Sequence, residues 1–252
     1  MLHRIQCLLL LGPLLLAGCP VTQPQDTPVS QQLVTEPSTR REYWLYVPSG
    51  YSADRAWPLV ITLHGTNFWD TGSAQIKEWK ALAEEYGFIA VAPKLRGYST
   101  QGILPVPHSW RMDDLREDEQ FILALLDDLA GRYNLDRSKV LLTGFSAGGF
   151  PLYYVGLRNH ERFSMLVARA CNSDVRVFES IELTEEMRKL PIFIYWGRDD
   201  LGRINDQSWQ AFAWLRRHKF YQTERRLTEG GHLRQPEVGL KHWMGCLDKR
   251  SK

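Results

Sequence analysis

The sequence predicts an α/β protein: a single domain with a mostly parallel central sheet and helices on both of its faces. Two observations support this prediction. Short apolar segments of strand character alternate with longer segments whose apolar residues recur at helical spacing. One strand-like segment, residues 139–143, leads directly into a glycine-rich turn and a helix-like segment, residues 150–158. Such alternation favours a parallel sheet, because each helix returns the chain to the start of the next strand.

Strands are predicted where apolar, aromatic and β-branched residues cluster between turn signals. Residues 42–47 are aromatic and β-branched and stop at Pro48. Residues 59–63 are almost continuously apolar, which is typical of a parallel strand buried on both faces. The other predicted strands cover residues 88–92, 139–143, 163–169, 192–196 and 221–227.

Helices are predicted from apolar stripes and from the residues that end them. Residues 76–86 carry apolar side chains at helical spacing and stop at Gly87. A longer stripe over residues 115–129 ends near Gly131. Further helices are expected at residues 150–158, around 209–213 and at 237–246. Together these elements predict one domain over residues 39–252, a size that suits a single hydrophobic core.

Residues 1–18 have the features of a signal peptide. Arg4 gives the start of the chain a positive charge, and residues 7–17 are largely apolar. This segment is too short to cross a membrane, which takes about 20 residues. Its end, Leu-Ala-Gly before Cys19, resembles the lipobox of bacterial lipoproteins. The resemblance implies a lipid on Cys19 and an exported protein anchored to a bacterial cell membrane. The alternative is an ordinary secretory signal with an incidental cysteine.

Residues 19–38 are expected to form a flexible tether between the lipid anchor and the folded domain. Pro, Gln, Thr and Ser dominate this segment, and apolar residues are few. A segment of this composition cannot bury enough apolar surface to offset the entropy lost on ordering.

The net charge bears on nucleic-acid binding, and the cysteines bear on disulfide and metal binding. The formal net charge is +2, and the basic residues are scattered among acids, so a nucleic-acid partner is not expected. Cys171 and Cys246 form an even pair in a chain predicted to be exported, where disulfides persist. The sequence leaves their pairing open, because it does not show the distance between them. They lack metal-ligand spacing, and neither a metal nor an organic cofactor is expected.

The pentapeptide Gly144–Gly148 reads G-x-S-x-G and lies between a predicted strand and a predicted helix. In that position the pattern predicts a nucleophile elbow, a strained turn that holds the hydroxyl of Ser146 above the sheet. The flanking glycines allow backbone segments to approach more closely than a Cβ atom permits. Taken alone, the pattern also fits a simple glycine-rich turn.

With this elbow in place, the chain resembles the α/β-hydrolase fold over nearly everything after residue 39. In that family a serine, an acid and a histidine follow in this order, each at a strand end. The resemblance implies Ser146 as the first, Asp200 of a G-x-x-D motif as the second, and His232 after the last strand as the third. Asp199 is the alternative acid.

This triad performs acyl transfer, because His232 removes the proton of the weakly nucleophilic Ser146 hydroxyl and later donates it to the leaving alcohol. The carboxylate fixes the imidazole tautomer. The oxyanion needs backbone donors, which we expect at Ala147 and at Thr66, with Gly65 as the alternative to Thr66. His64 is expected to brace that loop rather than to act as a base.

Three segments, residues 43–48, 63–65 and 118–121, look like those of secreted polyhydroxybutyrate depolymerases and feruloyl esterases. The resemblance implies a serine carboxylic-ester hydrolase. Its expected substrates are short-chain or aryl esters of small molecules, or esters borne on a polymer. Thr66 departs from that group, which often has glycine or cysteine after His-Gly.

The segment between the strands ending near residue 170 and starting at 192 is too short for a large lid, so we expect an open site. Phe68, Trp110 and Trp196 are expected to bind substrate there, although they could instead only pack the rim.

Two other functions remain: a serine peptidase of the same fold, and a non-catalytic surface binding protein. The expected lack of a propeller or large cap counts against the first, and the three intact triad residues count against the second.

Overall fold

The computed structural model describes residues 28–67, 69–96 and 110–250. Within these residues one sheet of eight strands has the order β1-β2-β4-β3-β5-β6-β7-β8. The strands are β1 (Val29–Thr35), β2 (Glu42–Val47), β3 (Trp57–Leu63), β4 (Ile89–Pro93), β5 (Leu135–Ser146), β6 (Met165–Cys171), β7 (Ile192–Gly197) and β8 (Thr223–Thr228). Strands β1 and β2 are antiparallel to their neighbours, and the pairs from β4 through to β8 are parallel. The prediction of a mostly parallel sheet is confirmed.

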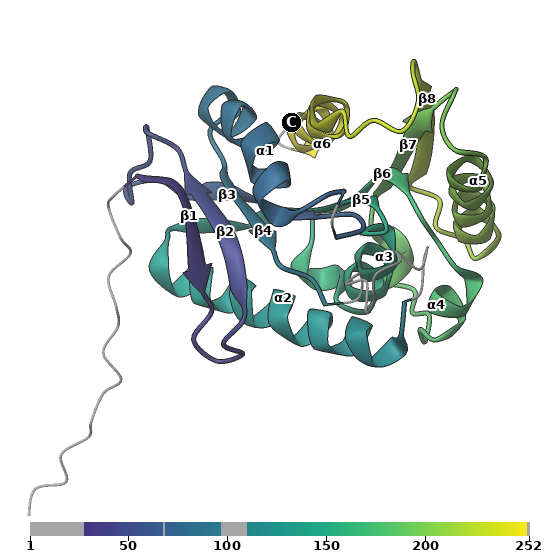
Figure 1. Ribbon diagram of the computed structural model, residues 1–252, viewed down its shortest axis with the longest axis horizontal. Coiled ribbons are helices and arrows are strands. Elements are labelled where there is room, and N and C mark those ends of the chain that lie inside the picture. Colours follow the sequence, from purple (N-terminus) through teal and green to yellow (C-terminus); the bar gives the residue numbers. More distant parts are fainter. Residues whose placement is uncertain (1–27, 68, 97–109, 251–252) are drawn as a thin grey trace, which may run out of the picture.

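Helices cover both faces of this sheet (Figure 1). They are α1 (Gly72–Tyr86), α2 (Met112–Arg132), α3 (Gly149–Arg158), α4 (Val175–Glu179), α5 (Gly202–Arg217) and α6 (Pro236–Arg250), with 3₁₀ turns at His160–Arg162 and Met187–Lys189. Helices α1 and α6 pack on one face, and α2 to α5 pack on the other. Alternate residues of each central strand therefore enter different cores: Ile61 of β3 lies on the α2 side and Val60 on the α1 side.

Helix α1 shows how local sequence sets an element's ends. The Thr71 hydroxyl accepts a hydrogen bond from the N–H of Ala74, which caps the first turn. Gly87 follows the last turn with a φ of 70°, a left-handed conformation that glycine adopts without steric cost. The predicted stop at Gly87 is therefore confirmed. Asp70 comes just before this cap, so the helix start fixes the end of the loop that follows β3.

Strand β1 corrects the predicted tether, which was placed over residues 19–38. Residues 29–35 pair antiparallel with β2 at the edge of the sheet. The side chains of β1 are exposed or half-buried, so the strand is held mainly by backbone hydrogen bonds to β2. A strand held by backbone pairing needs few apolar side chains, so the composition of residues 19–38 did not reveal it. The folded domain therefore begins before residue 39.

The two cysteines in the described part of the chain are free, which corrects the possible disulfide between Cys171 and Cys246. Cys171 ends β6 and is buried in the core on the α2 side, where its thiol donates to the carbonyl of Gly144. Cys246 lies on α6 and packs against the core on the other face. The sheet separates the two thiols, and the sequence alone does not show on which face each one lies.

No helix among the described residues combines the length and apolar character that a membrane crossing requires. The predicted signal peptide and Cys19 lie outside the described residues.

Candidate active site

Ser146 is the last residue of β5 and has a φ of 52°, a left-handed conformation that is strained for a residue with a Cβ atom. A hydrogen bond of 2.8 Å from the N–H of Gly148 to the carbonyl of Phe145 closes the turn. A Cβ atom on Gly148 would lie 2.6 Å from the carbonyl oxygen of Leu63, and one on Gly144 would lie 2.6 Å from that of Gly148. Both glycines are therefore required by close backbone contacts, as the elbow motif predicts.

The structure brings Asp200 to His232. Asp200 follows β7, its side chain is buried, and its Oδ1 lies 2.9 Å from Nδ1 of His232. The same oxygen accepts a hydrogen bond from the N–H of Leu201. Asp199, the alternative acid, is exposed. Asp200 is therefore the carboxylate that can orient the His232 imidazole.

His232 lies beside the elbow. Its ring packs against that of Phe145, the residue before Ser146, with centroids 4.7 Å apart. Among the described residues, neither the Ser146 hydroxyl nor Nε2 of His232 makes a hydrogen bond. Catalytic hydrogen bonds are often long without substrate and tighten when it binds, so this geometry is compatible with a serine–histidine pair.

The loop after β3, of which the structure describes residues 64–67 and 69–70, lies against the serine and is referred to below as the oxyanion loop. A Cβ atom on Gly65 would lie 3.0 Å from the Cβ of Ser146. The N–H of Gly65 donates to Oδ2 of Asp70 at 2.7 Å. Among the described residues, no hydrogen bond leaves the N–H of Thr66 or that of Ala147. The geometry therefore favours Thr66 over Gly65 as an oxyanion donor.

His64 braces this loop. Its Nδ1 is 2.8 Å from the carbonyl of Gly65, and the N–H of Leu95 donates to its Nε2. Burial lowers the pKa of the imidazole. Because Nε2 accepts from the N–H of Leu95, the ring proton belongs on Nδ1, which donates to the carbonyl of Gly65. Both ring nitrogens are bonded to backbone groups, which agrees with the predicted bracing role.

Three aromatic residues were expected to bind substrate, and for Trp196 this prediction is wrong. It is fully buried, and its Nε1 donates to Oδ1 of Asn205, whose amide in turn donates to the carbonyl of Asp200. Trp196 therefore supports the acid from the core and does not line a cleft. Trp110 is half-buried, and its Nε1 donates to Asp174. Phe68 lies outside the described residues.

A buried polar network beneath the elbow was not predicted from the sequence. Arg169 is fully buried on β6 and donates to Thr62, Thr143 and the Gln75 carbonyl. The Gln75 amide donates to Asp70, which also accepts from Arg234, a residue two positions after His232. The one signal in the sequence was the charged Arg169 inside an otherwise apolar strand.

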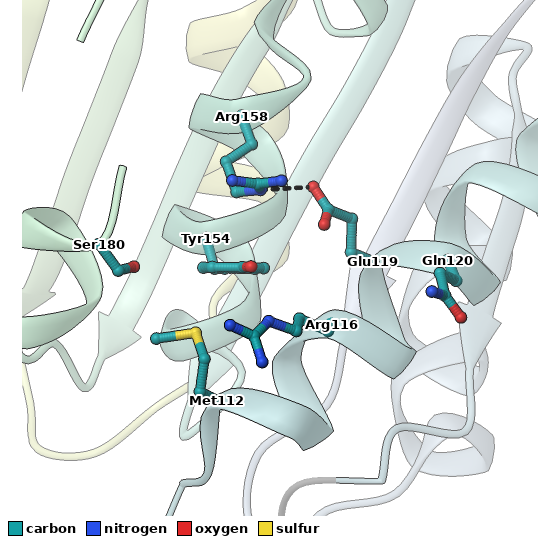
Figure 2. Close-up of a pocket in the computed structure, with 7 residues that line it drawn as sticks. All are labelled: Met112, Arg116, Glu119, Gln120, Tyr154, Arg158 and Ser180. Atoms are coloured by element: carbon teal, nitrogen blue, oxygen red, sulfur yellow. Dashed lines mark hydrogen bonds and ion pairs between the residues drawn. The ribbon is translucent and has the colours of Figure 1, made fainter. Parts of the chain in front are cut away.

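A separate hollow of about 410 Å³ lies between α2 and α3. Figure 2 shows Arg158 of α3 joined to Glu119 of α2, with Tyr154 and Arg116 alongside. None of Ser146, Asp200 and His232 lines this hollow. No group of three or more metal-ligating side chains is present in the described part of the chain.

The sheet order and the serine at the elbow after β5 place the protein in the α/β-hydrolase class. Residues 75–230 match the model of the prolyl oligopeptidase family. The chain belongs to this family and is an enzyme of the serine hydrolase type. The matched region includes Ser146 and Asp200 and ends just before His232.

The comparisons with known proteins include esterases and a peptidase. A bifunctional acetylxylan esterase/xylanase from Neocallimastix patriciarum is 26% identical over 214 residues, which are 84% of this chain and 29% of that protein. The chain thus spans less than a third of this relative. A ferulic acid esterase from Anaeromyces mucronatus, solved in complex with ferulic acid, is 16% identical with a TM-score of 0.59, over 85% of this chain and 90% of that one. Dipeptidyl peptidase 4 from Porphyromonas gingivalis is 13% identical with a TM-score of 0.63, over 88% of this chain and 36% of that one.

Proposed function

We propose that the protein is a serine carboxylic-ester hydrolase in which Ser146 is the nucleophile, His232 the general base and acid, and Asp200 the residue that orients His232. The observation that carries the proposal is the contact of 2.9 Å between Asp200 and His232, because the histidine it orients packs beside the strained elbow of Ser146. The likeness to an acetylxylan esterase over 84% of the chain supports ester hydrolysis in particular.

In the proposed reaction, the Ser146 oxygen attacks the ester carbonyl carbon while its proton moves to Nε2 of His232. The negative oxygen of the tetrahedral intermediate accepts hydrogen bonds from the N–H groups of Thr66 and Ala147. Collapse of the intermediate breaks the bond to the alcohol, which leaves with the proton from His232. Water then attacks the acyl-enzyme by the same route and releases the acid and the free serine.

We propose short-chain, aryl or polymer-borne esters as substrates. The connection between β6 and β7, which the structure describes in full, holds α4 and one 3₁₀ turn and has no large lid. Trp110 and Phe68 are proposed to contact the acyl or aryl group. The ferulic acid bound by the solved esterase is an aryl acid and supports this choice.

Replacement of Ser146 by alanine tests the proposal. The variant should fold as the wild type does and lose at least about 10⁴-fold in kcat on 4-nitrophenyl acetate. A fluorophosphonate should label the wild type at Ser146 and leave the variant unlabelled. A variant that kept a tenth of the wild-type activity would show that Ser146 is not the nucleophile.

A serine peptidase is the second candidate, because the family match and the resemblance to a dipeptidyl peptidase favour it. The same triad cleaves amides as well as esters. Matched ester and anilide substrates with one acyl group separate the two functions. We expect kcat/KM to be far higher for the ester; comparable values on a dipeptide anilide would favour the peptidase.

We further propose that the protein is exported and anchored to a bacterial membrane through a lipid on Cys19. The apolar segment followed by Leu-Ala-Gly-Cys supports this proposal. Cys19→Ser should move the protein from the membrane fraction to the soluble one. Mass spectrometry that found an unmodified mature terminus at another residue would refute the anchor.

A further inference from the structure

One carboxylate joins the two loops that surround Ser146. Oδ1 of Asp70, at the end of the oxyanion loop, accepts a hydrogen bond of 2.8 Å from Nη1 of Arg234. Arg234 lies two residues after His232, in the loop between β8 and α6. Nε of Arg234 also donates to Glu78 on α1, at 2.6 Å. Arg234 therefore ties the segment that carries His232 to the loop that carries Thr66.

The second carboxylate oxygen of Asp70, Oδ2, is also fully used as an acceptor. It accepts from the N–H of Gly65 and from the Gln75 amide, both at 2.7 Å. The Gln75 carbonyl is held in turn by Arg169 at 2.7 Å and Thr62 at 2.8 Å, so its amide group can face Asp70 in one orientation only. Asp70 is 4% exposed, and every partner presents a donor to it. The site therefore suits a side chain with two acceptor oxygens, whereas the amide of asparagine would turn a donor toward these donors.

Because Gly65 lies between Asp70 and the site, the hydrogen bonds of Asp70 also fix the backbone next to Ser146. Gly65 packs against Ser146 and immediately precedes Thr66. A shift of about 1 Å in a group that stabilises a transition state can cost about 10²-fold in rate. Movement of Asp70 would therefore displace Thr66 N–H from the oxyanion.

We propose that Asp70 and Arg234 are positioning residues that hold the oxyanion loop and the His232 segment in register around Ser146. This inference rests on the proposed function. Neither residue contacts the reacting atoms: Arg234 acts through Asp70, and Asp70 acts through the backbone of Gly65.

Arg234→Gln is the variant that tests the inference. The side chain of Arg234 is 28% exposed, so its loss removes the link with little change to the core. On the neutral substrate 4-nitrophenyl acetate, kcat should fall about 10- to 100-fold while KM stays within about threefold. An aryl trifluoromethyl ketone forms an adduct in which the Ser146 oxygen bonds the carbonyl carbon and the oxyanion occupies the site of the intermediate. Its affinity should fall by the same factor as kcat/KM, because it binds as the transition state does.

Three further variants serve as controls. Arg234→Lys keeps one ion pair with Asp70 and should recover part of the lost kcat. Glu78→Gln removes only the outer partner of Arg234 and should cost less than Arg234→Gln. Arg198→Gln breaks an exposed ion pair with Glu229 in the same region and should change kcat by less than about twofold. Rates are taken per fluorophosphonate-titrated site, so that any unfolded fraction does not count.

The outcomes separate this inference from the proposed function. A wild type that reacted with neither the fluorophosphonate nor the ester would refute the proposed function whatever the variants did. A reactive wild type with an unchanged Arg234→Gln variant would refute the positioning role alone. A variant that raised KM and kept kcat would show that Arg234 binds substrate, which also refutes it.

Discussion

Nδ1 of His232 contacts Oδ1 of the buried Asp200, whereas the carboxylate of the adjacent Asp199 is exposed. Asp200→Asn should therefore lower kcat by about 10⁴-fold, because an amide at this position favours the wrong imidazole tautomer. Asp199→Asn serves as the matched control and should change kcat by less than a few-fold. Steady-state rates on 4-nitrophenyl acetate measure both. A larger loss in Asp199→Asn would exchange the roles of the two residues.

Gly148→Ala should destabilise the elbow. The added Cβ would lie 2.6 Å and 2.7 Å from the carbonyl oxygens of Leu63 and His64, which belong to packed backbone. We expect the free energy of unfolding to fall by about 1–3 kcal/mol and fluorophosphonate labelling to slow. Gly245→Ala is the control, since its added Cβ meets open space within α6. Urea denaturation compares the two, and equal stabilities would contradict the close contact at Gly148.

Glu36→Gln should change how stability depends on pH. Burial raises the pKa of Glu36, but hydrogen bonds from Thr39 and Ser38 outweigh it and hold the pKa below 4.5. The carboxylate therefore adds stability above pH 4.5, and that stability is lost as the pH falls through the lowered pKa. The difference in Tm between wild type and variant should be largest near neutral pH and narrow in acid.

Glu85→Gln on the exposed side of α1 is the matched control for this experiment and should show a small difference in Tm at every pH. A gap between wild type and Glu36→Gln that widened on acidification would contradict the assigned hydrogen bonds.

The two thiols should differ in reactivity. Burial raises the pKa of Cys171 to about 12, so it holds almost no thiolate at neutral pH. In the native protein iodoacetamide should alkylate the half-buried Cys246 and spare Cys171, which should react only after unfolding. Peptide mapping by mass spectrometry without reductant should find no peptide that joins the two. A joined peptide would contradict their placement on opposite faces of the sheet.

Most of the sheet could be predicted because its strands and helices carry local signals. The apolar residues of β3 and the stop of α1 at Gly87 are local features, and the structure places both as predicted. Strand β1 escaped prediction because it is held mainly by pairing with β2, while only its half-buried Val29 and Val34 pack against the core. Helix α4 was missed because five residues are too short to show an apolar stripe.

In the candidate site, too, the residues in local motifs could be predicted, whereas those that depend on contacts between distant segments could not. Ser146, Asp200 and His232 lie at or shortly after strand ends, in motifs that can be found in the sequence, and the structure brings Asp200 and His232 into contact. The roles of Asp70 and Arg234 depend on a contact between distant segments, and no local motif marks it. Trp196 was misplaced because the sequence does not show whether the end of β7 faces solvent or the core.

The ion pair between Asp70 and Arg234 joins positions 164 residues apart in the chain. A contact of such long sequence separation closes a large loop, and we expect it to form late in folding, because the entropy lost on closing that loop is offset only by the other contacts of the fold. A growing polypeptide can complete α1 and the elbow while β8 and the segment after it are still being synthesised. Hydrolytic activity therefore appears as a property of the finished chain, and regain of activity after dilution from denaturant should lag behind the regain of helical structure.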